Sequence, residues 1–432
     1  MKTGKFEVQA IVMVLTGLLC LSVFAGTTLT PPHPLSVIDA ERIAISSAPE
    51  IQRLQDNGKA LKQQAIANRQ LPDPKLIAGA INVPTNTFSF NQDDMTMVEV
   101  GLEQYFPPGH SLAMKSNQTR ALATAEKRKA AEKTIMILQN VRDTWLDLYY
   151  WTHAANIVRS NRTLMSFLLK SSQSQYSTGK DNLSNVLQVK LERSRLDDQL
   201  DQIHQRIDIL RAQLARWIGQ NQADRKLSTL PKWPNPPSLA VMQTQLQRHP
   251  LLKVDSANVI AASDEVAFAK EQFKPGFTVG LDYGVRQGNM MDANNGMPVE
   301  RSNMITAQVS MDLPLFTHNR QSRRLRASSY QLQSAQLERQ VHYRDLLKAL
   351  REQYALFQQL SLREKIYSRH LIPVANQNSK AAMLAYRSDT TDLATVLRAY
   401  TGARNIKLEQ LQIKIERYKA RSALLYLQGL SQ

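Results

Sequence analysis

The residues that could do chemistry in this chain are few, and their spacing excludes most catalytic sites. The eight histidines never lie at the i, i+4 spacing that places two metal ligands on one face of a helix. The only cysteine is Cys20, inside an apolar N-terminal run. No serine-nucleophile motif in a pocket-forming context and no phosphate-binding glycine loop is found. The sequence therefore predicts no enzyme activity, no cofactor and no metal centre.

Methionine is the one potential ligand type that gathers in a region. Thioether sulfurs suit Cu(I), but methionine in strands and loops is also an ordinary apolar filler. We interpret these residues as packing residues, with a soft-metal site as the minor alternative. They are Met95, Met97, Met114, Met290, Met291, Met297, Met304 and Met311.

Residues 1–25 have the pattern of a secretion signal. Lys2 and Lys5 precede an apolar run from Ala10 to Phe24, and Ala25 provides a small residue for cleavage. The run is shorter than the ~20 apolar residues of a spanning helix, so cleavage is favoured over an uncleaved anchor. A lipoprotein at Cys20 is disfavoured, because such sites want a small residue where Leu19 stands.

The composition is typical of an exported protein that consists largely of long helices. Hydrophobic residues make up 43% of the 432 residues, and the net charge is +17. The basic residues are interleaved with acids, and aromatics are only 6%, so a solvated helical surface is favoured over nucleic-acid binding. No later stretch is apolar enough for a membrane helix, so a membrane-spanning form would need strands in a closed barrel.

The chain is predicted to contain two copies of one unit. Ala48-Pro49 matches His249-Pro250, and Tyr176 with Val186-Leu187 matches Tyr386 with Val396-Leu397. Such ordered matches indicate an internal repeat. We divide the chain into a signal (1–25), a first repeat (26–219), a proline-rich linker (220–237) and a second repeat (238–432).

Each repeat is expected to run in the order helix, strand, strand, very long helix, turn, shorter helix. In the first repeat these segments are 36–71, 75–83, 96–106, 110–172, 176–182 and 183–218. In the second they are 238–273, 277–286, 305–316, 318–384, 386–392 and 393–428. The loops within the strand pairs, 84–95 and 287–303, are polar.

Apolar residues at alternating steps of four and three predict a coiled-coil seam. The first long helix would span about 95–100 Å at 1.5 Å per residue, about twice the length of the shorter helix. The seam residues are Leu138, Val141, Trp145 and Leu148, and Leu196, Leu200, Ile203, Ile207, Leu210, Leu214 and Trp217.

The predicted fold is mainly α with a β-barrel contribution. Four strands are too few to close a barrel, which needs at least ~8 strands, so the barrel would be assembled from several chains. A long coiled-coil α-barrel would continue from it and form a hollow conduit.

This order resembles the TolC-like outer-membrane efflux family over nearly the whole mature chain. The resemblance rests on Tyr176-Ser-Thr-Gly179 leading to Val186-Leu187, on its second copy, and on Leu102-Glu-Gln-Tyr-Phe106-Pro-Pro-Gly109. It implies a homotrimer in the Gram-negative outer membrane with a large periplasmic extension. It also implies a periplasmic adaptor, an inner-membrane RND-type pump driven by protons, and passive conduction through the duct.

By the same resemblance, the two helical turns form the periplasmic tip, which narrows the aperture and contacts the adaptor. Gly179 in the first turn corresponds to Asp389 in the second, and Gln188 and Arg398 argue against an acidic ring beside the Val-Leu pairs. Asp181 and Asp392 remain candidates for such a ring, although Asp392 and Asn182 also suit helix N-capping. The candidate tip residues are Tyr176, Gly179, Asp181, Leu183, Val186, Leu187, Tyr386, Asp389, Asp392, Leu393, Val396 and Leu397.

The cargo is predicted from a resemblance to the heavy-metal (cobalt–zinc–cadmium) branch, in Pro72-Asp-Pro74, Asn82-Val-Pro84 and Met95-Thr-Met97. One alternative keeps the duct and changes the cargo to drugs or a secreted polypeptide. Another is a soluble periplasmic coiled-coil scaffold or adaptor, in which the strand segments would face water.

Overall fold

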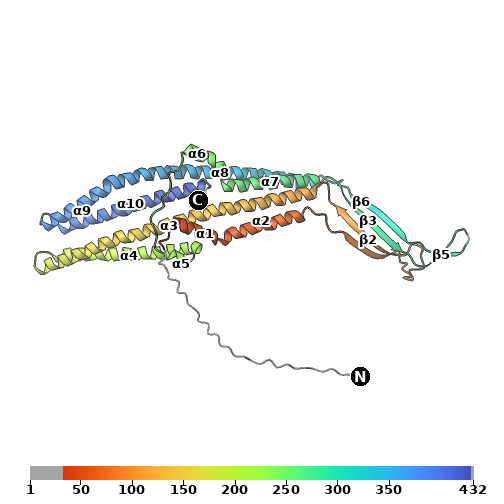
Figure 1. The fold of residues 1–432 in the computed structure, drawn as a ribbon, viewed down its shortest axis with the longest axis horizontal. Coiled ribbons are helices and arrows are strands. Elements are labelled where there is room, and N and C mark those ends of the chain that lie inside the picture. Colours follow the sequence, from red (N-terminus) through yellow and green to blue (C-terminus); the bar gives the residue numbers. More distant parts are fainter. Residues whose placement is uncertain (1–32, 295, 430–432) are drawn as a thin grey trace, which may run out of the picture.

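A computed structural model describes residues 33–294 and 296–429 of the chain. The predicted signal peptide lies outside these residues. The molecule is elongated, with a long helical body and a sheet that projects from one end of it (Figure 1). The two helical turns lie at the opposite end of the body (Figure 1).

The main helices and strands run in the same order through both halves of the chain, although the second half has additional short elements. The first half contains α1 (Val37–Ser46), α2 (Pro49–Ala67), β1 (Lys75–Ile81), β2 (Met97–Phe106), α3 (Ser111–Ser177), α4 (Leu183–Ile218) and α5 (Gln220–Ala223). The second contains α6 (Leu239–Gln245), η1 (Leu246–Arg248), α7 (Pro250–Glu271), β3 (Gly276–Val285), β4 (Asn289–Met291), β5 (Pro298–Glu300), β6 (Met304–Asp312), α8 (Gln321–Ile366), η2 (Tyr367–Leu371), α9 (Ile372–Arg387) and α10 (Leu393–Leu427).

The four main strands and both closing helices are confirmed near the predicted bounds, but the single helices predicted over 36–71 and 238–273 are wrong. Each is broken before a proline, at Ala48 and at His249. The proline ring disfavours the helical conformation of the residue before it, and both residues are extended, with ψ of 103° and 135°. Proline then suits the first position of the helix that follows, so α2 and α7 begin at Pro49 and Pro250.

The long helix of the second half is also interrupted. α3 runs unbroken for 67 residues, whereas its counterpart consists of α8, the five-residue π-helical turn η2 and α9. Pro373 lacks the N–H that would bond to the Arg369 carbonyl, and its ring would clash with that carbonyl in a regular helix. A π-helical turn adds one residue at this point and relieves the clash. The loop predicted over 287–303 also differs, since it contains the paired strands β4 and β5.

The core of the helical body forms around α3, which packs against α2, α4, α7 and α10. Trp145 is fully buried, and its indole N–H donates to the Leu35 carbonyl oxygen at 3.1 Å. The predicted seam is confirmed except at its end, where Trp217 is half-buried and Ile218 is buried instead.

The sheet is antiparallel and has the strand order β1-β2-β3-β6. The pairing of β2 with β3, from Val98↔Val285 to Phe106↔Phe277, joins the two halves of the chain. Within the described chain, β1 and β6 are the edge strands of this sheet. Among the described residues, no helix is both long enough and apolar enough to cross a membrane.

The loops at the outer end of the sheet are joined by two arginines of the second half. Arg301 is buried and pairs with the Asp94 carboxylate at 2.6 Å, and it also donates to the Asp93 carbonyl at 3.1 Å. Arg286 donates to the Asp94 carbonyl and to the Ser302 carbonyl. These contacts fix the loop after β1 against the loop after β3.

Candidate functional site

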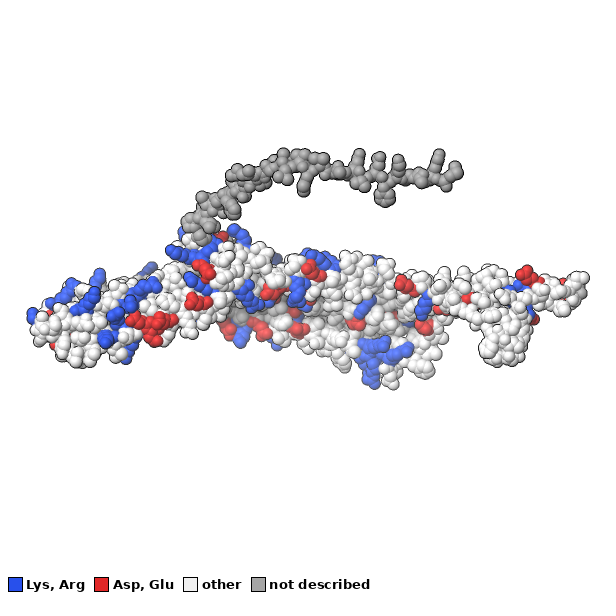
Figure 2. Space-filling model, turned by 90° about the horizontal axis from the view of Figure 1, so that it is seen from below, with Lys and Arg blue, Asp and Glu red and all other residues white. Residues whose placement is uncertain are grey.

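The sheet has one apolar face and one polar face, because side chains alternate along each strand. The apolar face is exposed: Leu76, Leu281 and Ile305 are 71%, 58% and 73% accessible. On the face seen in Figure 2 the sheet end carries few charges, whereas charges of both signs cover the helical body. The other exposed residues of this apolar face are Val98, Val100, Leu102, Phe277, Val279, Tyr283, Val285, Val309 and Met311.

The polar face of the sheet is acidic. Four carboxylates lie on it, from Glu99, Glu103, Asp282 and Asp312, and the strand register places them on the same side. Lys75, which is paired in register with Glu103, is the only basic residue of these four strands. This balance is the reverse of the whole chain, which has 54 basic and 37 acidic residues.

Glycines make room for these acids. Gly101 lies opposite Asp282 in the register, and a Cβ at Gly101 would collide with the Asp282 carboxylate. Asp282 is only 5% accessible, and its carboxylate makes no ion pair within the described part of the chain. Gly280 likewise lies between Glu103 and Gln308, and the Gln308 amide nitrogen donates to the Glu103 carboxylate at 3.3 Å. We did not predict this acidic face, although the acids alternate with apolar residues in the sequence.

The two turns at the far end of the body are built alike. Asn182 caps α4 by accepting a hydrogen bond from the Asn185 N–H, and Asp392 caps α10 by accepting one from the Thr395 N–H, both at 2.9 Å. The predicted capping roles are therefore confirmed. Asp181 accepts bonds from the Asn185 amide and the Ser172 hydroxyl, so its carboxylate is used within its own turn.

The turns differ at the residue with positive φ. Gly179 has φ of 72°, and its place is taken in the second turn by Asp389, with φ of 55°. The left-handed conformation costs a non-glycine residue roughly 1–2 kcal/mol, although Asp tolerates it better than most. The second turn therefore retains a conformation that its sequence favours less than the first.

The apolar tip residues also differ between the turns. Leu393, Val396 and Leu397 are buried, whereas Leu183 and Leu187 are 50% and 54% accessible. The tyrosines are divided in the same way, since Tyr386 packs against the core and Tyr176 is exposed, whereas Val186 of the first turn is buried like Val396. The Tyr386 hydroxyl donates to the Gln175 side-chain oxygen at 2.9 Å, which links the second turn to α3.

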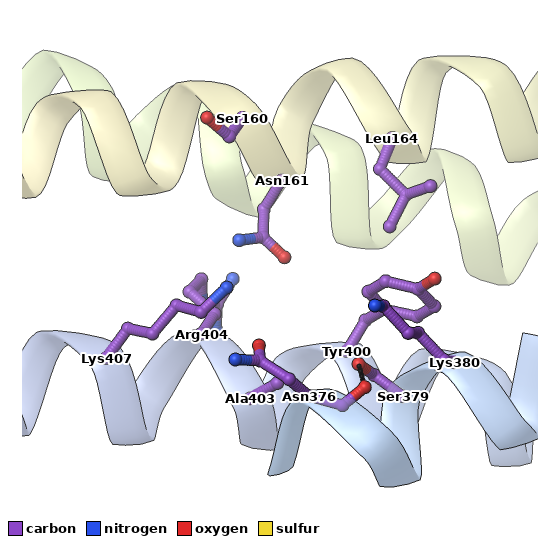
Figure 3. Close-up of a pocket in the computed structure, with 10 residues that line it drawn as sticks. All are labelled: Ser160, Asn161, Leu164, Asn376, Ser379, Lys380, Tyr400, Ala403, Arg404 and Lys407. Carbon is purple, nitrogen blue, oxygen red and sulfur yellow. Dashed lines mark hydrogen bonds between the residues drawn. The ribbon is translucent and has the colours of Figure 1, made fainter. Parts of the chain in front are cut away.

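We call α3 with α4 the first hairpin, and α8, η2 and α9 with α10 the second hairpin. A pocket of about 260 Å³ lies between them (Figure 3). Asn161 of α3 faces it from one side, and Lys380 of α9 and Arg404 and Lys407 of α10 face it from the other (Figure 3).

Buried charges cross the middle of the body, and nothing in the local sequence pattern revealed them. Glu41 of α1 pairs with Arg142 of α3 at 2.5 Å, and both side chains are buried. The Arg142 guanidinium lies 5.8 Å from the ring centroid of Trp233, in the linker. Arg421 of α10 donates to the Pro234 carbonyl at 2.8 Å. The linker is thus bound to both hairpins.

No group of three histidine, cysteine or acidic side chains in residues 33–294 and 296–429 is placed to hold a metal ion. His342 is 2.9 Å from the Asp255 carboxylate, and no third ligand accompanies them. Burial lowers the pKa of His249 to about 4, although its hydrogen bond to the Tyr426 carbonyl opposes this shift. These histidines therefore have structural partners.

Asp143 provides a test of the buried charges. Its Oδ1 is inaccessible to solvent, and burial raises its pKa from 3.8 to about 6, although Ser422, Lys419 and Arg142 oppose this shift. The folded state thus binds a proton more tightly than the unfolded state, so the native protein gains stability as the pH falls from above 6 towards 4. We expect Asp143→Asn to raise the free energy of unfolding at pH 7.5 by about 3 kcal/mol, at ~1.4 kcal/mol per pKa unit.

The measurement is the melting temperature of the detergent-extracted protein at pH 7.5 and pH 4.5. The gain should shrink to about 1 kcal/mol at pH 4.5, where the native carboxyl is mostly neutral but the unfolded carboxyl is still mostly ionised. Asp56→Asn, at an exposed carboxylate paired with Lys59, should give no such gain. Equal effects of Asp143→Asn at both pH values would refute the electrostatic explanation.

Comparison with known proteins gives one family and one fold. Residues 241–430 match the family model described as "Outer membrane efflux protein". No curated protein matches the sequence. The fold is similar to the outer membrane protein VceC from Vibrio cholerae, with 16% identity, a TM-score of 0.74, and coverage of 91% of this chain and 96% of VceC.

Two further solved structures have the same fold. The outer-membrane channel OprN has 14% identity and a TM-score of 0.75, with coverage of 91% of this chain and 89% of OprN. CusC, studied for transmembrane channel formation, has 14% identity and a TM-score of 0.74, with 91% coverage of both chains. The matched family consists of efflux proteins and not enzymes. The family match covers residues 241–430, which is less than half of the chain, and the solved structures, at 14–16% identity, show that the chain shares the fold of these outer membrane proteins.

Proposed function

We propose that this protein is the outer-membrane channel subunit of a tripartite, proton-driven efflux system and that it passively conducts heavy-metal cations. The assembly we propose is a homotrimer. Both edge strands, β1 and β6, have unpaired backbone groups in the single chain, and such groups must be paired inside a bilayer. Three copies would supply twelve strands in a closed barrel.

The dimensions and polarity of the sheet support this assembly. β2, β3 and β6 have 10, 10 and 9 residues, and a membrane-crossing strand needs about 9–11. The exposed apolar face suits contact with lipid, which leaves the polar face to line the passage. A water-soluble scaffold would gain nothing from exposing that many large apolar side chains.

The observation that carries the cationic cargo is the acidic polar face. Four carboxylates against one lysine would give each copy a net negative wall, in a chain whose remaining surface is basic. A passage lined by one sign of charge raises the local concentration of ions of the opposite sign. The wall therefore favours cations over anionic or bulky apolar cargo.

We further propose that the two turns form the periplasmic aperture and the contact with a periplasmic adaptor, which would link them to an inner-membrane RND-type pump. The exposed Leu183 and Leu187 support a contact surface in the first turn, while the Tyr386–Gln175 bond holds the second turn against α3. A Cβ at Gly179 would meet no atom within 4 Å, so a side chain there would project from the tip.

Substitutions at the tip test this placement. Gly179→Glu and Leu183→Glu should reduce export at least severalfold without preventing assembly of the oligomer, because they add charge to the proposed aperture and remove no core contact. Metal efflux from cells and cross-linked oligomer size are the two measurements. Leu122→Glu, an exposed apolar position of α3 far from the turns, is the matched control. Normal export in both tip variants would show that the aperture lies elsewhere.

The acidic face is tested in planar bilayers. The wild-type protein should conduct, and its reversal potential in a KCl gradient should indicate a preference for K⁺ over Cl⁻. We expect Glu99→Gln combined with Asp282→Asn to reduce that preference at least twofold at low salt, because screening weakens the effect at high salt. Glu300→Gln, outside the four-stranded sheet, should leave it unchanged. Unchanged selectivity would refute the role of the acidic face but leave the channel proposal intact. Absence of any conductance would refute the channel proposal itself.

The cargo is tested in the native host. Deleting the gene should reduce tolerance to zinc, cadmium, cobalt or copper, and complementation should restore it. Drug tolerance should change little, because the proposed passage favours small cations. Loss of drug tolerance alone would refute the metal cargo and favour a drug-exporting duct.

A further inference from the structure

We propose that the pocket between the two hairpins is a binding site for a small organic dianion with two carboxylates. The site is independent of the proposed cargo. It has a volume of about 260 Å³ and is lined by α3 on one side and by α9 and α10 on the other.

Cationic groups lie at both ends of the pocket. Figure 3 shows Arg404 and Lys407 together at one end and Lys380 beside Tyr400 at the other, with Asn161 of α3 facing them across the space. An anion with one charge could contact only one end. An elongated ligand with a carboxylate at each terminus would place one negative charge at each end.

The positive charge in the pocket is not balanced by the protein. Glu192 of α4 is 3.4 Å from Arg404, whose side chain is 12% accessible. Neither Lys380 nor Lys407 has an ion-pair partner in residues 33–294 and 296–429. Three cations therefore share one acid, and a dianion would supply the missing negative charge.

Neutral groups in the pocket can complete the recognition of carboxylates. The Tyr400 hydroxyl has no hydrogen-bond partner among the described residues, so it is available to donate. The amides of Asn161 and Asn376 lie on opposite walls (Figure 3). Hydrogen bonds to an ionised group are roughly twice as strong as those between neutral groups.

The position of the pocket gives such a ligand a structural consequence. On the side of the turns, the Tyr386 hydroxyl bonds to Gln175 at 2.9 Å. On the side of the middle of the body, Lys419 pairs with Asp147 at 2.9 Å. The pocket lies between these two links, where no ion pair among the described residues joins α3 to the second hairpin, and the Arg404–Glu192 pair joins that hairpin to α4. A bound dianion would bridge α9 and α10 to α3 and hold the hairpins together.

The test uses the full-length protein in detergent, titrated calorimetrically with glutarate, with phosphate and chloride at matched ionic strength for comparison. Glutarate should bind and raise the melting temperature, and chloride should not. Lys407→Gln should raise the dissociation constant for glutarate at least tenfold. Lys380→Gln should do the same but change any phosphate binding less than twofold, because phosphate would occupy only the other end.

The matched control is Lys414→Gln, which makes the same change on α10 outside the pocket and should leave glutarate binding unaltered. Lys380 is exposed, so its variant should fold even if the Lys407 variant does not. An equal loss of affinity in the Lys414 variant would show a nonspecific effect of net charge and overturn the proposal. Phosphate binding as tight as glutarate binding would also overturn the proposal. The same holds if glutarate does not bind when it is present in 10-fold excess over phosphate.

Discussion

The antiparallel pairing of β2 with β3 is the contact on which the rest of the structure depends. It joins the first and second halves of the chain by nine residue pairs, from Val98↔Val285 to Phe106↔Phe277. Because each of these strands is connected to a long helix of its own half, the pairing brings α3 and α7 together at the sheet end of the body. The aromatic rings of Phe106 and Phe277 stack at 4.9 Å where the sheet meets the helices. With β2 and β3 in the centre, β1 and β6 become the edges that need another chain.

The distribution of charge separates the molecule into two environments. The helical body carries solvated charges of both signs with an excess of basic ones, whereas the polar face of the sheet is acidic. One group of buried charges lies in the middle of the body, where Arg142 pairs with Glu41 and lies against Trp233 of the linker. Burying charge is costly even when it is paired, so this cluster contributes more to fixing the position of the linker than to stability. Together with the bond from Arg421 to the Pro234 carbonyl, it binds the linker to α3 and α10.

The two hairpins have similar architectures but differ in helix continuity, in the turn residue with positive φ and in the exposure of their apolar residues. The first has an uninterrupted α3, a glycine at its turn and exposed leucines beyond it. The second has the η2 turn, an aspartate with positive φ and buried apolar residues at the corresponding positions. Such differences show that the hairpins occupy different environments despite their matching sequences. The pocket between them, with its unbalanced lysines, is a consequence of two similar but not identical surfaces meeting.

The sequence by itself determined what depends on neighbours in the chain. Helix periodicity gave α3, α4 and α10, and turn chemistry gave the caps at Asn182 and Asp392, because such contacts reach only a few residues. The prediction failed where a proline interrupted a helical pattern. The breaks before Pro49, Pro250 and Pro373 were missed, because the periodicity of apolar residues continues through them. Only the tertiary structure decided what joins distant segments: the strand register that collects Glu99, Glu103 and Asp282 on one face, the Glu41–Arg142 pair and the pocket at Lys380 and Lys407. The physical reason is that burial and unbalanced charge are properties of packed surfaces, and no single segment contains them.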